Sequence, residues 1–209
     1  MARRKLTIEL EPIVRGAMGA ADDEDEVAQV VLDATEGLLR TFGLSRWSVD
    51  DVAERSGLGR TTVYRRFRSR DDLVHGVLAR ELRGAIAEVS RAAASQPTLD
   101  LAVVEAALAA LRALDRSVVD RLLHTDPATV LPFLTTGAGP LIDQTRRAFV
   151  PILLAADIAA EEDDAALVAE ALARLGLSFV LTRSTVLPLG DPEALRARVA
   201  GLVLPLVRR

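Results

Sequence analysis

Six arginines lie between residues 55 and 70, a segment that contains no Asp, Glu or Lys and so carries a local charge of +6. A guanidinium group can pair with a phosphate oxygen, or bind guanine O6 and N7 through two parallel hydrogen bonds. The whole chain has a formal net charge of −4, which hides this basic segment. The local charge therefore indicates a candidate nucleic-acid-binding segment, whose arginines are Arg55, Arg60, Arg65, Arg66, Arg68 and Arg70.

Hydroxyl and aromatic side chains stand among these arginines over residues 57–67. At helical spacing Val63 and Phe67 lie one turn apart, and we expect both to face the preceding helices. The outward face would then carry Arg60, Thr61, Tyr64 and Arg65. A threonine methyl can contact a thymine methyl in the DNA major groove. Residues that suit phosphate oxygens are Thr62, Tyr64 and Arg66.

Glycines mark the helices that must position these side chains. A helix is expected over 26–42, ending at Gly43, and a second over 49–56, ending at Gly57. A third helix, over 60–67, carries the arginines. Two short helices across a tight turn form the helix-turn-helix unit. The inward face of the first helix is predicted to hold Val27, Val30, Val31, Ala34, Leu38 and Phe42.

Two serines have the spacing of helix N-caps. Ser48 precedes Asp51 by three positions, and Ser69 precedes Asp72 likewise, so each pair can satisfy the first N–H groups of a helix. The second pair opens a long helix expected over 70–94. Backbone N–H groups left free at these helix starts suit a phosphate oxygen.

The stretch from Val52 to Leu73 resembles the DNA-binding domain of the tetracycline-repressor (TetR) family, and the likeness spans about residues 27–75. Gly59 stands where the family usually has Ser or Thr, and Arg70 where it usually has Lys. Beyond residue 80 only length and helical layout are similar. The matching residues are Ala53, Gly57, Thr62, Tyr64, Phe67 and Leu73, with Phe42 and Gly43 ending the preceding helix.

This resemblance implies a homodimeric, ligand-responsive transcriptional regulator that represses by blocking polymerase at a palindromic operator. Family dimers pair through the last two long helices, here about residues 164–204, and hold an effector within the C-terminal helices. The effector changes the spacing of the two recognition helices, and so the affinity for paired half-sites. The implied base contacts are Arg60, Thr61, Thr62 and Tyr64. The implied phosphate contacts are Ser48, Tyr64, Arg65, Arg66 and Arg70.

The fold expected for the whole chain is all-α. Alanine, leucine, arginine and glutamate dominate, and aromatic residues make up only 3%. Aspartate–proline pairs at 126–127 and 191–192 predict helix starts. In the last two helices, apolar residues at alternating four- and three-residue steps predict a packing seam. The seam comprises Val168, Leu172, Leu175, Phe179, Thr182, Val186, Leu195, Val199 and Leu202.

Three segments are expected: an N-terminal arm over 1–26 that can be disordered, a DNA-binding domain over 27–72, and an effector-binding and dimerisation domain over 73–209. The arm begins with the basic tip Arg3-Arg4-Lys5. This tip could contact DNA, or stay solvated without a role. Residues 6–18 contain enough apolar side chains to dock or to form an extra helix, and the pattern does not decide between these.

Several polar residues of the C-terminal half admit two interpretations. His124, with Arg121 and Asp126, could line a ligand pocket, although a structural role at a helix end is favoured. Others lie in apolar helical stretches, where they would either orient a ligand or face solvent. These residues are Gln144, Arg147 and Arg183.

The composition excludes several other functions. The chain has no cysteine and so no thiolate site, and its two histidines lie too far apart in the sequence for a metal site of the H-x-x-x-H type. No apolar run approaches the length of about 18 residues that crosses a bilayer, so a cytoplasmic protein is expected. The phosphate-binding and nucleophile motifs of common enzymes are absent, and no cofactor beyond an unidentified effector is expected. The competing interpretation is a helical dimeric module that binds a ligand or protein and binds DNA weakly.

Overall fold

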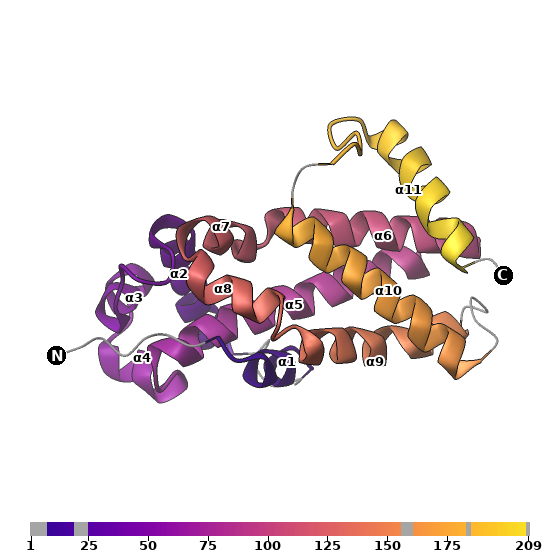
Figure 1. Cartoon of the computed structure of the whole chain (residues 1–209). Helices are drawn as coiled ribbons and strands as arrows, with labels where there is room; N and C mark the ends of the chain where they lie inside the picture. Colours follow the sequence, from indigo (N-terminus) through magenta and orange to yellow (C-terminus); the bar gives the residue numbers. More distant parts are fainter. Residues whose placement is uncertain (1–7, 19–24, 156–160, 183–184, 208–209) are drawn as a thin grey trace. The chain divides into compact units, whose positions relative to one another are not determined.

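A computed structural model describes residues 8–18, 25–155, 161–182 and 185–207 of the chain. Within these ranges every regular element is a helix, as predicted, and none of them is long and apolar enough to span a membrane. The helices, labelled in Figure 1, are α1 (Leu10–Met18), α2 (Glu26–Phe42), α3 (Val49–Ser56), α4 (Arg60–Arg66), α5 (Arg70–Ala94), α6 (Leu99–Arg116), α7 (Val118–Thr125), α8 (Pro127–Leu134), α9 (Gly139–Ala155), α10 (Glu162–Leu181) and α11 (Pro192–Val207).

The helices form two compact units that do not follow chain order. The N-terminal unit combines residues 1–83 with 117–138, and the C-terminal unit combines 84–116 with 139–209. Helices α7 and α8 therefore pack with the N-terminal helices, although they continue directly from α6 and lead into α9.

The core of the N-terminal unit is enclosed by α2, α3, α4 and the first half of α5. Side chains with no exposed surface include Val31, Leu39, Val52, Val63 and Val74. The predicted bounds of α2, α3 and α5 are confirmed, and α4 ends one residue earlier than expected. The capping signals therefore located these helix ends correctly.

The inward face predicted for α2 is wrong at two positions. Val30 and Phe42 are 43% and 44% exposed, and the buried face is turned toward Ala28, Leu32 and Thr35. The Thr35 hydroxyl donates to the carbonyl of Val31 at 2.8 Å, which allows this polar residue to be fully buried. Apolar residues occur on more than one side of this helix, so their spacing alone does not select the core side.

The described part of the N-terminal arm forms the helix α1, and this helix also docks on the protein. The two outcomes that the sequence left open for residues 6–18 therefore occur together. Ile13 and Ala17 of α1 are 3% and 5% exposed. The N–H of Glu9 donates to Nε2 of His75 in α5 at 3.0 Å. At the other end of α1, the Arg83 guanidinium donates to the carbonyl oxygens of Gly16 and Ala17. The basic tip at residues 3–5 lies outside the described residues.

Asp126 joins the start of α8 to the turn between α2 and α3. Its carboxylate accepts from the Leu44 N–H at 2.7 Å and from the Ser45 hydroxyl at 3.0 Å. Asp126 precedes Pro127 as predicted, but its side chain makes no capping hydrogen bond to α8. Gly43 lies beside it with φ +67, and an added Cβ there would collide with Asp126 Oδ2. This close approach gives a physical reason for glycine at the end of α2.

A second link joins α7 to α5 through Glu81. This carboxylate accepts from the Ser117 hydroxyl at 2.7 Å and from the Val118 N–H at 2.8 Å, and Arg40 lies 3.3 Å away. Burial raises the pKa of the Glu81 carboxyl, against the opposing effect of these hydrogen bonds and Arg40. The Arg121 guanidinium also donates to the Arg40 carbonyl at 3.1 Å. Arg121 and Asp126 thus have structural roles, as the favoured interpretation expects.

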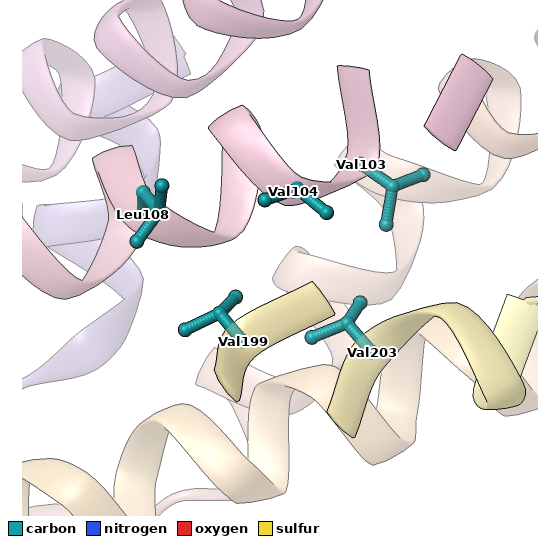
Figure 2. Close-up of a cluster of buried hydrophobic side chains, with 5 residues drawn as sticks. All are labelled: Val103, Val104, Leu108, Val199 and Val203. Atoms are coloured by element: carbon teal, nitrogen blue, oxygen red, sulfur yellow. The ribbon is translucent and has the colours of Figure 1, made fainter. Parts of the chain in front are cut away.

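The C-terminal unit has two clusters of buried side chains. Figure 2 shows the first, in which Val103, Val104 and Leu108 of α6 face Val199 and Val203 of α11. The second joins α9 to α10 through Leu153, Ala165 and Ala169. Of the predicted seam, four members pack against the first cluster within this chain: Val168, Leu172, Leu195 and Val199 itself.

Candidate nucleic-acid interface

Helix α4 presents most of its polar side chains to solvent. Val63 is fully buried and fixes the side of the helix that faces the protein. Phe67 is half-buried just beyond the helix end, and Thr62 is half-buried within it. The exposure predicted for the outward face is confirmed for Arg60, Thr61, Tyr64 and Arg65.

The turn before α4 is held by its own backbone. Gly57 adopts the left-handed conformation, with φ 70, at the end of α3. The N–H of Leu58 then donates to the carbonyl of Ala53 at 3.2 Å. Gly59 is the N-cap residue of α4 and offers no side-chain cap, whereas the family usually has a hydroxyl at this position. Its carbonyl accepts the first helical hydrogen bond, from Thr62 N–H at 2.9 Å.

Arg60 makes contacts with two neighbouring side chains. Its Nε lies 2.6 Å from Oδ1 of Asp50 in α3. Its guanidinium carbon lies 6.0 Å from the centre of the Tyr64 ring, at the outer limit of a cation–π interaction. Both charged side chains remain largely exposed, at 62% for Arg60 and 55% for Asp50. The arginine is thus held in place at the surface without being buried.

Arg66 is tied to the beginning of α2. Its Nε lies 3.0 Å from Oδ2 of Asp25, and Oδ1 of the same carboxylate accepts from Ala28 N–H at 3.3 Å. One carboxylate therefore both caps α2 and pairs with the end of α4. Arg65 and Arg68 are exposed on the same segment.

Ser48 forms the predicted capping box with Asp51. The Ser48 backbone N–H and hydroxyl donate to Asp51 Oδ2 at 2.6 and 2.8 Å, and the Asp51 N–H donates to the hydroxyl at 3.4 Å. Ser69 accepts from Asp72 N–H at 3.0 Å, while the Asp72 carboxylate accepts from Arg68 N–H. The starts of α3 and α5 are therefore each fixed by reciprocal hydrogen bonds between a serine segment and an aspartate.

Arg70 packs on the single tryptophan of the chain. Its guanidinium lies 4.4 Å from the centre of the Trp47 ring. Trp47 is 2% exposed and donates from its ring N–H to the Gly43 carbonyl at 2.8 Å. Ring stacking suits the planar guanidinium of arginine better than the ammonium of lysine, which the family usually has here. The start of α5 is therefore anchored to the segment before α3.

The structure brings the predicted residues together around α4 and adds partners that sequence reasoning missed. The missed partners are Asp50, Asp25 and Trp47. All three lie outside the +6 segment, and none belongs to a recognisable motif. Contact of the predicted residues with DNA stays a prediction. Arg183 lies outside the described residues, so its role is also untested.

Comparison with known proteins agrees with this arrangement. Residues 31–77 match the model of bacterial regulatory proteins of the tetR family, and residues 82–205 match the bacterial tetracyclin repressor C-terminal domain. The HTH-type transcriptional regulator AlkX of Mycobacterium tuberculosis is 30% identical over 188 residues, covering 86% of this chain and 84% of that protein.

Solved structures show the same fold. The crystal structure of the TetR family repressor AlkX from Dietzia sp., implicated in biodegradation of n-alkanes, is 28% identical with a TM-score of 0.65. The alignment covers 86% of this chain and 96% of that one. A TetR-family regulator from Streptomyces coelicolor has a TM-score of 0.55 at 20% identity, over 91% of this chain and 99% of its own. These relatives are regulators and not enzymes, and the present chain belongs to the TetR family of DNA-binding transcriptional regulators.

Proposed function

We propose that this regulator is a cytoplasmic repressor, which binds a palindromic operator as a homodimer through α4 and leaves it when a small molecule binds. The observation that carries the proposal is the division of α4 into a buried side at Val63 and an exposed side with Arg60, Thr61, Tyr64 and Arg65. A helix with this division can enter the major groove while its apolar side stays on the protein. The phosphates on either side of α4 would be bound by Thr62, Arg66, Arg70 and Ser48.

The dimer would form through α10 and α11. Leu167, Leu175 and Leu181 of α10 are 58%, 36% and 37% exposed, and Leu202 of α11 is 45% exposed. Val168 and Leu172 already face the intrachain core, and by helical spacing Leu175 lies beside them at the edge of that face. Leu167 and Leu181 lie on a different side of α10. Large exposed apolar side chains along one helix are typical of a surface that a partner covers.

The effector would be aliphatic. Phe149 and Phe179 are the only aromatic residues in the sequence of the C-terminal unit, so apolar contacts there come mostly from Leu, Val, Ile and Ala. Such side chains suit an alkyl chain better than a stacked planar ring. The repressor AlkX of Dietzia sp. is implicated in n-alkane breakdown. We therefore place the effector among the aliphatic compounds that such a breakdown passes through.

Helices α7 and α8 would carry the response to DNA. They lie between α6 and α9 in the chain, and both of those helices belong to the C-terminal unit. Asp126 and Glu81 attach them to the DNA-binding helices. A shift of α7 or α8 would therefore displace the α2–α3 turn, which leads through α3 to α4, the helix proposed to read DNA.

The test is selection of fragments from the source genome by the purified protein at two salt concentrations. The double variant Arg60→Ala/Tyr64→Ala serves as the control, since removal of each base contact costs about 1–3 kcal/mol. Enrichment of one palindrome by the wild type alone would support the proposal, and long-chain alkanes or fatty acids should then release it. Salt-sensitive binding without a shared palindrome, or no enrichment at all, would instead favour a ligand- or partner-binding module with weak or non-specific DNA binding.

A further inference from the structure

An ion pair links the two helices of the helix-turn-helix unit at its exposed side. Asp50 belongs to the first turn of α3, and Arg60 is the first residue of α4. The carboxylate Oδ1 lies 2.6 Å from Nε of the guanidinium. The two residues thus meet across the turn that separates the helices.

The atoms involved matter for what the arginine can still bind. An arginine side chain has five N–H donors, one on Nε and two on each terminal nitrogen. The carboxylate contacts Nε, whereas the two terminal nitrogens form a separate edge of the guanidinium, on a side chain that is 62% exposed. Guanine offers O6 and N7 in the major groove to two parallel N–H donors of this kind. The ion pair and the guanine contact are therefore compatible in one arginine conformer.

Stability does not explain this pair. Both side chains are more than half exposed, and exposed ion pairs contribute little to folding because solvent and salt screen them. The pair does restrict a long, flexible side chain, and the centre of the Tyr64 ring lies 6.0 Å from its guanidinium carbon. Such restriction before binding lowers the ordering cost of the later contact.

We propose that Asp50 is a positioning residue, which holds Arg60 ready for one guanine of the operator and so sets the preference for that base. This inference rests on the proposed function, because it requires α4 to read DNA. A carboxylate beside the groove also repels phosphates, and it should therefore weaken binding to every sequence. Asp50 then lowers general affinity and increases discrimination between bases.

The variant Asp50→Asn, which removes the charge and keeps the size, distinguishes the effect on general affinity from the effect on base discrimination. We expect stronger binding to a non-specific duplex, together with an approximately fivefold loss of preference for guanine at the base pair that Arg60 contacts. Preference at other positions should not change. Asp50→Glu, which keeps the charge, should recover part of the lost preference.

Glu54 provides a matched control. It is an exposed acid one turn further along α3, on the same side as Asp50. Glu54→Gln removes an equal charge and should strengthen non-specific binding while leaving every base preference intact. A thermal unfolding midpoint close to that of the wild type confirms that each variant is folded.

The experiment measures dissociation constants, by fluorescence anisotropy, for the selected operator, its single-base-pair variants and a non-specific duplex. The proteins are the wild type, Asp50→Asn, Asp50→Glu, Glu54→Gln, Arg60→Ala and the double variant Asp50→Asn/Arg60→Ala.

If Asp50 acts through Arg60, the double variant discriminates between bases no worse than Arg60→Ala alone. If Asp50→Asn behaves like Glu54→Gln, the positioning role is refuted while the proposed function stands. If Arg60→Ala retains full discrimination, α4 does not read DNA through Arg60 and the inference falls with that part of the proposed function.

Discussion

The carboxylate of Asp126 accepts a hydrogen bond from the backbone N–H of Leu44 at 2.7 Å, although the two residues are far apart in the chain. Asp126 stands before a proline at the start of α8, where its side chain would be expected to cap its own helix. Because it binds the α2–α3 turn instead, it forms a tertiary link. The same turn leads into the capping box at Ser48 and the helix-turn-helix unit.

The first prediction concerns Asp126→Asn. Loss of the charge-assisted bonds should lower the free energy of unfolding by about 1 kcal/mol. It should also weaken release of DNA by the effector, because α8 no longer holds the turn. Denaturant unfolding and DNA-binding titrations with and without effector measure the two effects.

Asp191→Asn is the matched control for this prediction. Asp191 also precedes a proline, but its carboxylate caps its own helix through Glu193 and Ala194 N–H, both at 3.1 Å. The control should lose some stability and keep its effector response. An unaltered response in Asp126→Asn would contradict the linking role.

The second prediction concerns Gly43→Ala. A Cβ at this position collides with Asp126 Oδ2 and lies 2.7 Å from Thr125 Oγ1, in addition to the strain of φ +67. Gly57 has a similar φ of +70 but open space around it. Gly57→Ala should therefore cost about 1 kcal/mol from backbone strain alone. Gly43→Ala should cost clearly more in the same denaturant titration, and equal costs would show that the Asp126 contact is unimportant.

Much of the fold could be predicted because its signals are local. Ser48, Asp51, Gly43 and Gly57 mark helix ends through contacts within a few residues, and the bounds of α2 and α3 followed from them. The buried face of α2 did not follow, because apolar residues lie on several sides and only packing selects one. Phe42, which the spacing assigns to the core, is exposed for this reason.

The candidate site was predictable only in part. Helical spacing correctly placed Arg60 and Tyr64 outward and Val63 inward. The partners of the arginines were not predictable, because Asp50, Asp25 and Trp47 reach them through tertiary structure. A charge count along the sequence treats the basic segment as uniform, whereas the fold pairs some arginines and leaves others exposed.

The third prediction concerns the pH dependence of stability. Burial raises the pKa of Glu81 in the folded protein, so the unfolded chain ionises this group at lower pH. Its contribution to stability is therefore fully present below the unfolded pKa of about 4.3, and is lost as pH rises through the folded pKa. Relative to Glu81→Gln, the wild type should lose stability across this window in denaturant titrations. A difference that stays constant with pH would argue against the shift.

The fourth prediction concerns the basic tip of the arm. Helix α1 is anchored to α5 through His75 and Arg83, so the residues before it start from a fixed point on the DNA-binding unit. Deletion of residues 2–5 should weaken DNA binding. It should also reduce the slope of log affinity against log salt by about 1 for each phosphate that the tip no longer neutralises. Replacement of Arg3, Arg4 and Lys5 by Gln keeps the length and should act alike, whereas an unchanged slope would mean that the tip is only solvated.

The last prediction concerns the dimer. Leu167→Glu and Leu181→Glu place a charge on the exposed side of α10, and burying an unpaired charge in an interface is strongly unfavourable. Both variants should sediment as monomers at micromolar concentration and lose operator binding, because one protomer holds only one half-site. Leu101→Glu on α6, where the native leucine is 40% exposed, makes the same chemical change outside α10 and α11 and should remain dimeric. A wild-type monomer would instead show that the predicted seam serves intrachain packing alone, as Val168 and Leu172 already do.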